Sequence, residues 1–120
     1  MATKTPVITQ LDPYDGSVMK FQWTLTGTDD GFPMPWAQWA DRSVQFAGTW
    51  AGGTVVWQGS NDGGTTWFTL SDAQTTAISK TADAMEQVVE VTELARPIAS
   101  VAVTSVVVSV VARRQQPMRT

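Results

Sequence analysis

The stretch Met19-Lys20-Phe21-Gln22-Trp23-Thr24-Leu25-Thr26 alternates apolar and polar side chains without interruption. Side chains of a β-strand point to opposite faces in turn, so this period places Met19, Phe21, Trp23 and Leu25 on one face. The pattern predicts a half-buried strand. The abundance of Val and Thr and the six Trp residues likewise favour strands over helices in the rest of the chain.

Alternating stretches and turn residues continue beyond this strand. Residues 42–50 alternate again, and the pair Gly52 and Gly53 predicts a hairpin turn into a strand at residues 54–59. A second reversal is expected at residues 61–64, because Asn, Asp and Gly tolerate the positive φ angles of tight turns. Residues 65–70 then form the returning strand.

The following segments give weaker signals. Residues 75–80 and 86–92 are shorter strand candidates, although the apolar spacing within residues 82–94 also permits a helix. We predict strand there. Residues 98–112 form one long strand, or two that break near Thr104 and Ser105.

The valine-rich segment at residues 98–112 has apolar side chains on both faces, which implies burial on both sides. A strand of a small sandwich has only one inner face, so this pattern predicts contact with a neighbouring subunit or an overlying arm. The segment is too short for a membrane span, and we expect no membrane partner.

Length and composition indicate one folded domain without catalytic equipment. The chain has 120 residues, of which 42% are hydrophobic and 16% charged. It contains no Cys and no His, which removes thiolate nucleophiles, the usual general base and the commonest metal ligands. A net charge of −3 without a basic run argues against nucleic-acid binding. We therefore expect a binding or structural role, with no catalytic residue, cofactor or metal.

The chain divides into three parts by pattern. Residues 1–17 have prolines and no sustained period, and predict an extended N-terminal arm. Residues 18–112 predict a small antiparallel β-sandwich or barrel of about seven or eight strands. Residues 113–120 form a polar C-terminal tail. The N-terminus has no secretion signal, so we expect synthesis in the cytoplasm.

The sharpest local motif is the stretch Ser60-Asn61-Asp62-Gly63-Gly64-Thr65-Thr66-Trp67. It resembles the Asp-box hairpin of sialidases and other propellers. In that motif the Ser and Asp side chains bond to the turn backbone while the Trp packs over the hairpin, so its role is structural. A propeller needs several such blades, and this chain has one copy. The structural turn residues expected from the motif are Ser60, Asp62, Gly64, Thr66 and Trp67.

Some aromatic residues and carboxylates are candidate ligand sites. Trp36 and Trp39 follow a loop rich in Pro, Gly and Asp, where an exposed pair could bind a partner or a carbohydrate; local packing is the alternative. The four Trp in alternating stretches fit the core or an interface. The close carboxylate pairs, Asp12 with Asp15 and Asp29 with Asp30, lack the spacing of a calcium loop and predict solvated turns.

Several segments together resemble a family of small proteins encoded among the head genes of tailed bacteriophages. They are residues 41–48 and 55–59, the turn at Asn61 and Asp62, Trp67 and Leu70, and residues 94–97 before the valine-rich strand. The resemblance implies an Ig-like or related β-sandwich that coats the capsid exterior as a decoration, or cement, protein. It further implies the major capsid protein as partner, a homo-oligomer with a trimer favoured, and a place in the virion.

The expected contact residues follow from this interpretation. A proline-bearing arm of seventeen residues spans up to about 55 Å and can reach a neighbour. We expect capsid or subunit contact from Val7, Ile8, Leu11 and Tyr14 of the arm, and then from Trp36 and Trp39. Two alternatives stay open: a tail or fibre module that binds a host glycan, and a tail-tube or head-completion subunit. An enzyme is the least favoured class.

Overall fold

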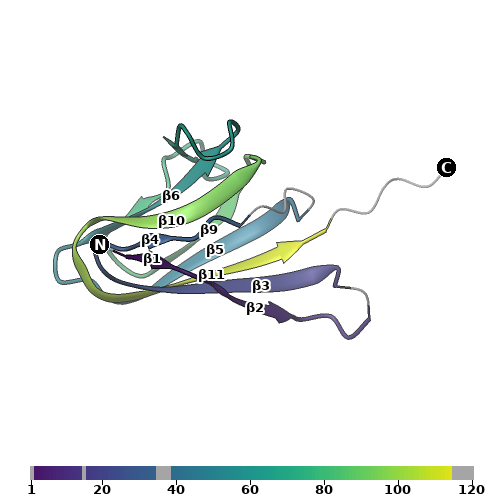
Figure 1. Cartoon of the computed structure of the whole chain (residues 1–120), viewed down its shortest axis with the longest axis horizontal. Coiled ribbons are helices and arrows are strands. Elements are labelled where there is room, and N and C mark those ends of the chain that lie inside the picture. Colours follow the sequence, from purple (N-terminus) through teal and green to yellow (C-terminus); the bar gives the residue numbers. More distant parts are fainter. Residues whose placement is uncertain (1, 15, 35–38, 115–120) are drawn as a thin grey trace.

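The computed structural model describes residues 2–14, 16–34 and 39–114 (Figure 1). Their strands form two sheets packed face to face, and the described residues contain no helix. The five-stranded sheet has the order β2 (Val7–Gln10), β3 (Val18–Gly27), β11 (Val103–Arg113), β5 (Asp41–Thr49), β9 (Ala84–Val88). The other sheet has the order β1 (Thr3–Lys4), β4 (Asp30–Gly31), β10 (Leu94–Val101), β6 (Thr54–Ser60), β7 (Phe68–Thr69), with β8 (Ser79–Lys80) also on β6.

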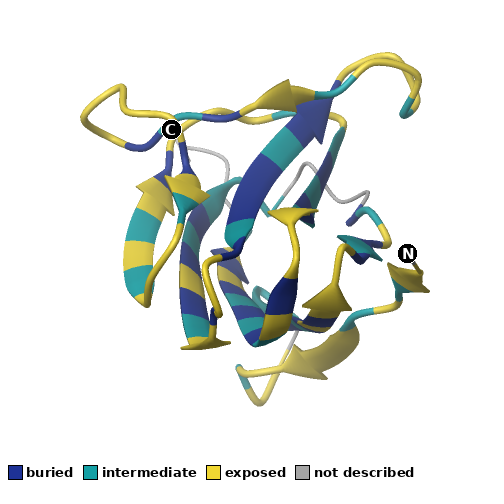
Figure 2. Ribbon diagram, turned by 90° about the vertical axis from the view of Figure 1, so that its left-hand side faces the viewer, coloured by how far each residue is buried: buried dark blue, intermediate teal, exposed yellow. Residues whose placement is uncertain are grey.

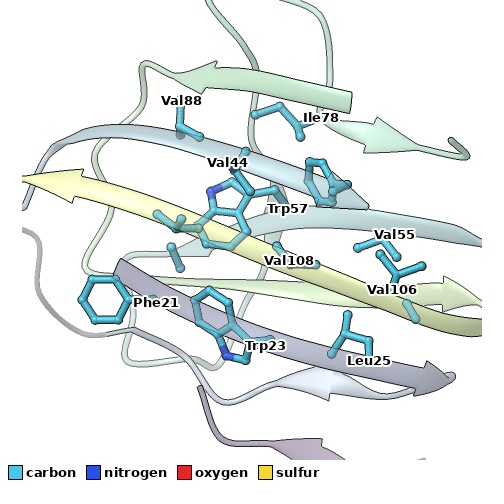
Figure 3. Close-up of a cluster of buried hydrophobic side chains, with 14 of the residues drawn as sticks. Phe21, Trp23, Leu25, Val44, Val55, Trp57, Ile78, Val88, Val106 and Val108 are labelled. Carbon is cyan, nitrogen blue, oxygen red and sulfur yellow. The ribbon is translucent and has the colours of Figure 1, made fainter. Parts of the chain in front are cut away.

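The core lies between the sheets and is built from the inner faces that alternation predicts (Figure 3). Trp23 of β3 meets Trp57 of β6 edge to face, with ring centroids 5.8 Å apart. Such aromatic contacts add to the free energy of burial. Fully buried aliphatic and aromatic side chains of the five-stranded sheet surround the pair: Phe21, Leu25, Val44, Phe46, Val106, Val108 and Val110.

The structure confirms a small all-β sandwich. Nearly all strand pairs are antiparallel, and the pair of β1 with β4 is parallel. The ambiguous segment at residues 82–94 contains strand β9, where Val88 is buried and Met85 points outward, so strand rather than helix is confirmed there. The valine-rich region forms two strands, β10 and β11, which separate at Ala102 rather than near Thr104 and Ser105.

The predicted hairpin around Gly52 and Gly53 is wrong. The turn has positive φ at Ala51 (49°) and Gly52 (78°), as hairpin turns do, but it leads from β5 in one sheet to β6 in the other. A Cβ at Gly53 would lie 2.3 Å from the carbonyl oxygen of Ala102. Gly53 therefore lets this link pack against the β10–β11 link, which crosses between the sheets beside it.

The hairpin of the Asp-box, in contrast, is confirmed. Strands β6 and β7 pair antiparallel on either side of it, with Gln58 opposite Thr69 and Gly59 opposite Phe68. The returning strand is shorter than predicted, since only Phe68 and Thr69 have strand geometry.

Residues of the predicted N-terminal arm are extended, and both of their strands pair with the sandwich itself. Strand β1 lies beside β4, and β2 lies beside β3 as the edge strand of the five-stranded sheet. Pro6 stands between β1 and β2, where the chain changes sheets. Proline has no N–H group to donate, which suits a position outside the hydrogen-bond ladders of β1 with β4 and of β2 with β3.

Candidate functional site

Strand β1 is held in place by the carboxylate of Asp29. This group accepts hydrogen bonds from the Ala2 amide, the Thr26 amide and the Thr26 hydroxyl, each 3.0 Å long. The ammonium group of Lys4 lies 3.5 Å from the same carboxylate. Backbone bonds from the Asp30 and Phe32 amides to the carbonyls of Ala2 and Lys4 complete the attachment.

The environment of Asp29 keeps it ionised. Burial alone would raise the pKa of this carboxyl, but hydrogen bonds from Thr26 and Ala2 and the charge of Lys4 lower the pKa below its ordinary value of 3.8. The N-terminal strand is therefore anchored by a charged group. The predicted solvated turn is wrong for Asp29, because its side chain is buried and accepts hydrogen bonds from Ala2 and Thr26.

Strand β2 and the loop after it expose apolar side chains. All four residues of β2 are exposed (Figure 2), and none carries a charge. Val7 is 65% exposed and Tyr14, in the loop, is 90% exposed; Leu11 is also exposed. Natural edge strands usually have charges, prolines or a covering segment that block pairing with another chain. This edge has only Pro6 at its start.

Register places Val7 and Ile8 on opposite faces of β2. Val7 lies opposite Gln22 on the outer face, whereas Ile8 lies opposite the core residue Phe21. Ile8 lines a hollow of about 200 Å³ between β2 and the segment after β4, together with Thr5, Pro6, Phe21, Phe32, Pro33 and Met34.

Phe32 is a further exposed aromatic residue at this hollow, and it was not among the predicted contact residues. It is 55% exposed beside this hollow, while its carbonyl accepts a hydrogen bond from Nε1 of the buried Trp23. Its place between Gly31 and Pro33, both turn formers, is the sequence signal for an exposed aromatic. We call β2, Leu11, Tyr14, Phe32 and Pro33 the N-terminal edge.

Of the two tryptophans expected as a second contact site, the structure describes Trp39. Trp39 is partly buried against the core, and its Nε1 donates a 3.0 Å hydrogen bond to the Gly16 carbonyl. It therefore packs locally, which was the alternative to an exposed binding aromatic. Trp36 lies outside the described residues.

The Asp-box turn is organised by Ser60 and Asp62. One oxygen of Asp62 accepts hydrogen bonds from the Ser60 hydroxyl (2.7 Å) and from the amides of Thr65 (3.1 Å) and Thr66 (2.9 Å). The Ser60 oxygen accepts from the Gly64 amide at 3.1 Å. Hydrogen bonds from the Thr66 amide, the Ser60 hydroxyl and the Thr66 side chain lower the pKa of Asp62 to about 2. The turn thus depends on an ionised carboxylate.

Trp67 ties this turn to the outer face of the sheet. Its Nε1 donates to the Gly64 carbonyl at 3.0 Å, and the guanidinium of Arg96 lies 4.0 Å from the ring centroid. Arg96 also bonds to Gln58 and forms a 3.2 Å ion pair with Asp30. These contacts give Trp67 a structural role.

The described residues give no sign of a metal centre or a helical membrane span. Among residues 2–14, 16–34 and 39–114, no three His, Cys, Asp or Glu side chains gather in a way that could hold a metal ion. Within the same ranges, no helix is long and apolar enough to cross a bilayer. No protein family, curated protein or solved structure matches this chain.

Proposed function

We propose that this chain is a non-enzymatic structural protein of a tailed-bacteriophage virion. In this proposal it binds the major capsid protein on the outer surface of the head and stabilises the capsid as a decoration protein. It acts as a homo-oligomer, with a trimer favoured. The resemblance of the segments between residues 41 and 97 to phage head proteins supports this assignment.

The observation that carries the proposal is the N-terminal edge. Its apolar side chains flank an uncharged edge strand and a hollow of about 200 Å³. Exposed apolar surface of this kind marks protein interaction sites more often than chance exposure. An extended capsid segment could add to β2 through main-chain hydrogen bonds and place one apolar side chain in the hollow.

A rigid platform favours this use of the edge. Asp29 anchors β1, and the side chain of Trp23 holds the segment around Phe32 by donating a hydrogen bond to the Phe32 carbonyl. Because these groups are already ordered, docking costs less conformational entropy than it would for a free arm. Repetition over a capsid makes even weak contacts sufficient, since each oligomer binds through several copies of the edge.

The test uses heads of the encoding phage that lack this protein. Purified protein is added, the particles are pelleted, bound copies are counted, and the melting temperature of the heads is measured with and without it. We expect saturable binding at a copy number related to capsid symmetry, together with a raised melting temperature. Light scattering of the free protein gives its oligomeric state.

A pair of edge variants assigns the surface. Ile8→Lys places a charge at the hollow, and we expect it to abolish binding to heads. Met85→Lys is the matched control, because Met85 is 61% exposed on β9, the opposite edge strand of the same sheet. Absence of saturable binding by the unaltered protein would overturn the proposal. Equal binding of heads by Ile8→Lys and Met85→Lys would show that the N-terminal edge is not the capsid-binding site.

A further inference from the structure

A second hollow lies between the Asp-box hairpin and the segment after β9. Its volume is about 330 Å³, which lies at the lower end of small-ligand sites, about 300 to 1,000 Å³. We call it the Asp-box hollow. It is lined by Gly59, Ser60, Asn61, Asp62, Thr66, Phe68, Leu70, Glu90 and Thr92.

Part of the wall of the Asp-box hollow is apolar, and Phe68 and Leu70 form it. Phe68 is 69% exposed on β7, and no described segment covers its ring. Leu70, which is buried, supplies a second apolar surface. Gly59 lies opposite Phe68, and a Cβ there would lie 2.6 Å from Oγ1 of Thr92. The absence of a side chain at Gly59 therefore lets Thr92 and Leu70 pack directly on the backbone of β6.

The polar groups of this hollow are already oriented. The side-chain oxygen of Asn61 accepts the Glu93 amide at 2.8 Å, which leaves the Asn61 NH₂ group without an acceptor in the described chain. One oxygen of Glu90 accepts the Ser71 amide, and its other oxygen meets no described donor. The Asp62 carboxylate is fixed by Ser60, Thr65 and Thr66.

These groups define the ligand chemistry. An exposed aromatic ring beside fixed hydrogen-bonding groups suits a sugar, whose C–H face packs on the ring while its hydroxyls donate to carboxylates and accept from an amide. The two carboxylates disfavour anionic sugars such as sialic acid. The charge of Asp62 is already satisfied by local donors, which makes the hollow less suited to an organic cation than to a neutral polyol.

We propose that the Asp-box hollow is a binding site for an uncharged hexose unit of a glycan, with Phe68 as the stacking platform and Asn61 and Glu90 as hydrogen-bonding groups. This activity goes beyond capsid attachment and uses residues distinct from the N-terminal edge. A virion carrying many copies would bind a glycan-coated surface with high avidity even if each site is weak.

The experiment follows backbone amide signals by two-dimensional NMR during titration with glucose, galactose, mannose and N-acetylglucosamine. We expect at least one sugar to give saturable shifts at Asn61, Thr66 and Phe68, with a Kd of about 1 mM. Sialic acid and methylammonium chloride are titrated in parallel, to test the anionic and cationic alternatives.

Two variants and one control complete the design. Phe68→Ala removes an exposed ring and should weaken binding about five-fold or more. Glu90→Gln keeps an oxygen for the Ser71 amide and should weaken binding to a smaller extent. Phe32→Ala, an exposed aromatic on the N-terminal edge, should leave sugar binding unchanged.

Several results would overturn this inference. They are the absence of saturable shifts with every sugar, shifts with sialic acid or methylammonium alone, and sugar binding that survives Phe68→Ala unchanged. Because capsid binding is read by sedimentation of heads and sugar binding by NMR on the free protein, failure of one proposal is distinguishable from failure of the other.

Discussion

Removal of the Asp29 carboxylate should detach the N-terminal strand and lower the stability of the domain. In Asp29→Ala the Ala2 and Thr26 donors lose their acceptor and Lys4 loses its ion-pair partner. Hydrogen bonds to charged groups contribute about 1.5 to 3 kcal/mol each. The conformational entropy that β1 gains when it detaches offsets the loss of the bond from Ala2, so the net loss comes from the two bonds of Thr26. We expect the free energy of unfolding to fall by about 3 kcal/mol.

The assay for Asp29→Ala combines urea unfolding with hydrogen exchange. Burial of Trp23 and Trp57 makes tryptophan fluorescence a suitable probe of global unfolding. The amides of Asp30 and Phe32 donate to the carbonyls of Ala2 and Lys4, so their protection from hydrogen exchange should drop selectively. The amide of Val110, in the middle of the five-stranded sheet, is the internal control.

The pH dependence of stability follows from the same group. Because the folded pKa of Asp29 is lowered, its contribution is present above the unfolded pKa, near 3.8, and is lost as pH falls through the folded pKa. Asp29→Ala should remove that part of the acid sensitivity. A loss of less than about 1 kcal/mol, or unchanged protection of the Asp30 and Phe32 amides, would refute this reasoning.

A pH titration probes the Asp-box turn, and a substitution probes the packing between the sheets. The Asp62 carboxyl should titrate near pH 2 by carbon NMR, so the order of the Asp-box turn should persist through pH 4 and decline as pH falls toward 2; titration near pH 4 would contradict the hydrogen bonding described here. Gly31→Ala would place a Cβ 2.6 Å from Cδ of Pro97 and 2.9 Å from Cδ1 of Trp23, and should lower the free energy of unfolding by about 1 to 3 kcal/mol in urea. A loss of less than about 0.5 kcal/mol in Gly31→Ala would contradict steric overlap of the new Cβ with Pro97 and Trp23.

Local patterns were enough to predict the class of fold and the Asp-box turn. Alternation at residues 19–25 predicted the buried face of β3, because side-chain direction in a strand depends only on position along it. The Asp-box turn was likewise readable, since its hydrogen bonds join residues within a few positions of one another. Both features depend on short-range geometry.

The partners of each strand depended on tertiary structure. The turn at Ala51 and Gly52 has hairpin-type φ angles, yet β5 pairs with β11 from Thr49 to Asp41 and β6 pairs with β10. Nothing within residues 42–59 distinguishes a hairpin from a link between sheets, because the choice rests on pairing with strands far along the chain.

The candidate sites show the same division. The sequence identified the exposed apolar residues of β2, but the hollow beside Ile8 needs Phe32 and Met34 from the segment after β4, and the Asp-box hollow needs Glu90 and Thr92 from the segment after β9. By itself the sequence determined strand character, one local turn and the absence of Cys and His. Tertiary structure alone decided which side chains meet. The reason is that each hollow forms between segments far apart in the sequence, and no local pattern predicts that such segments come into contact.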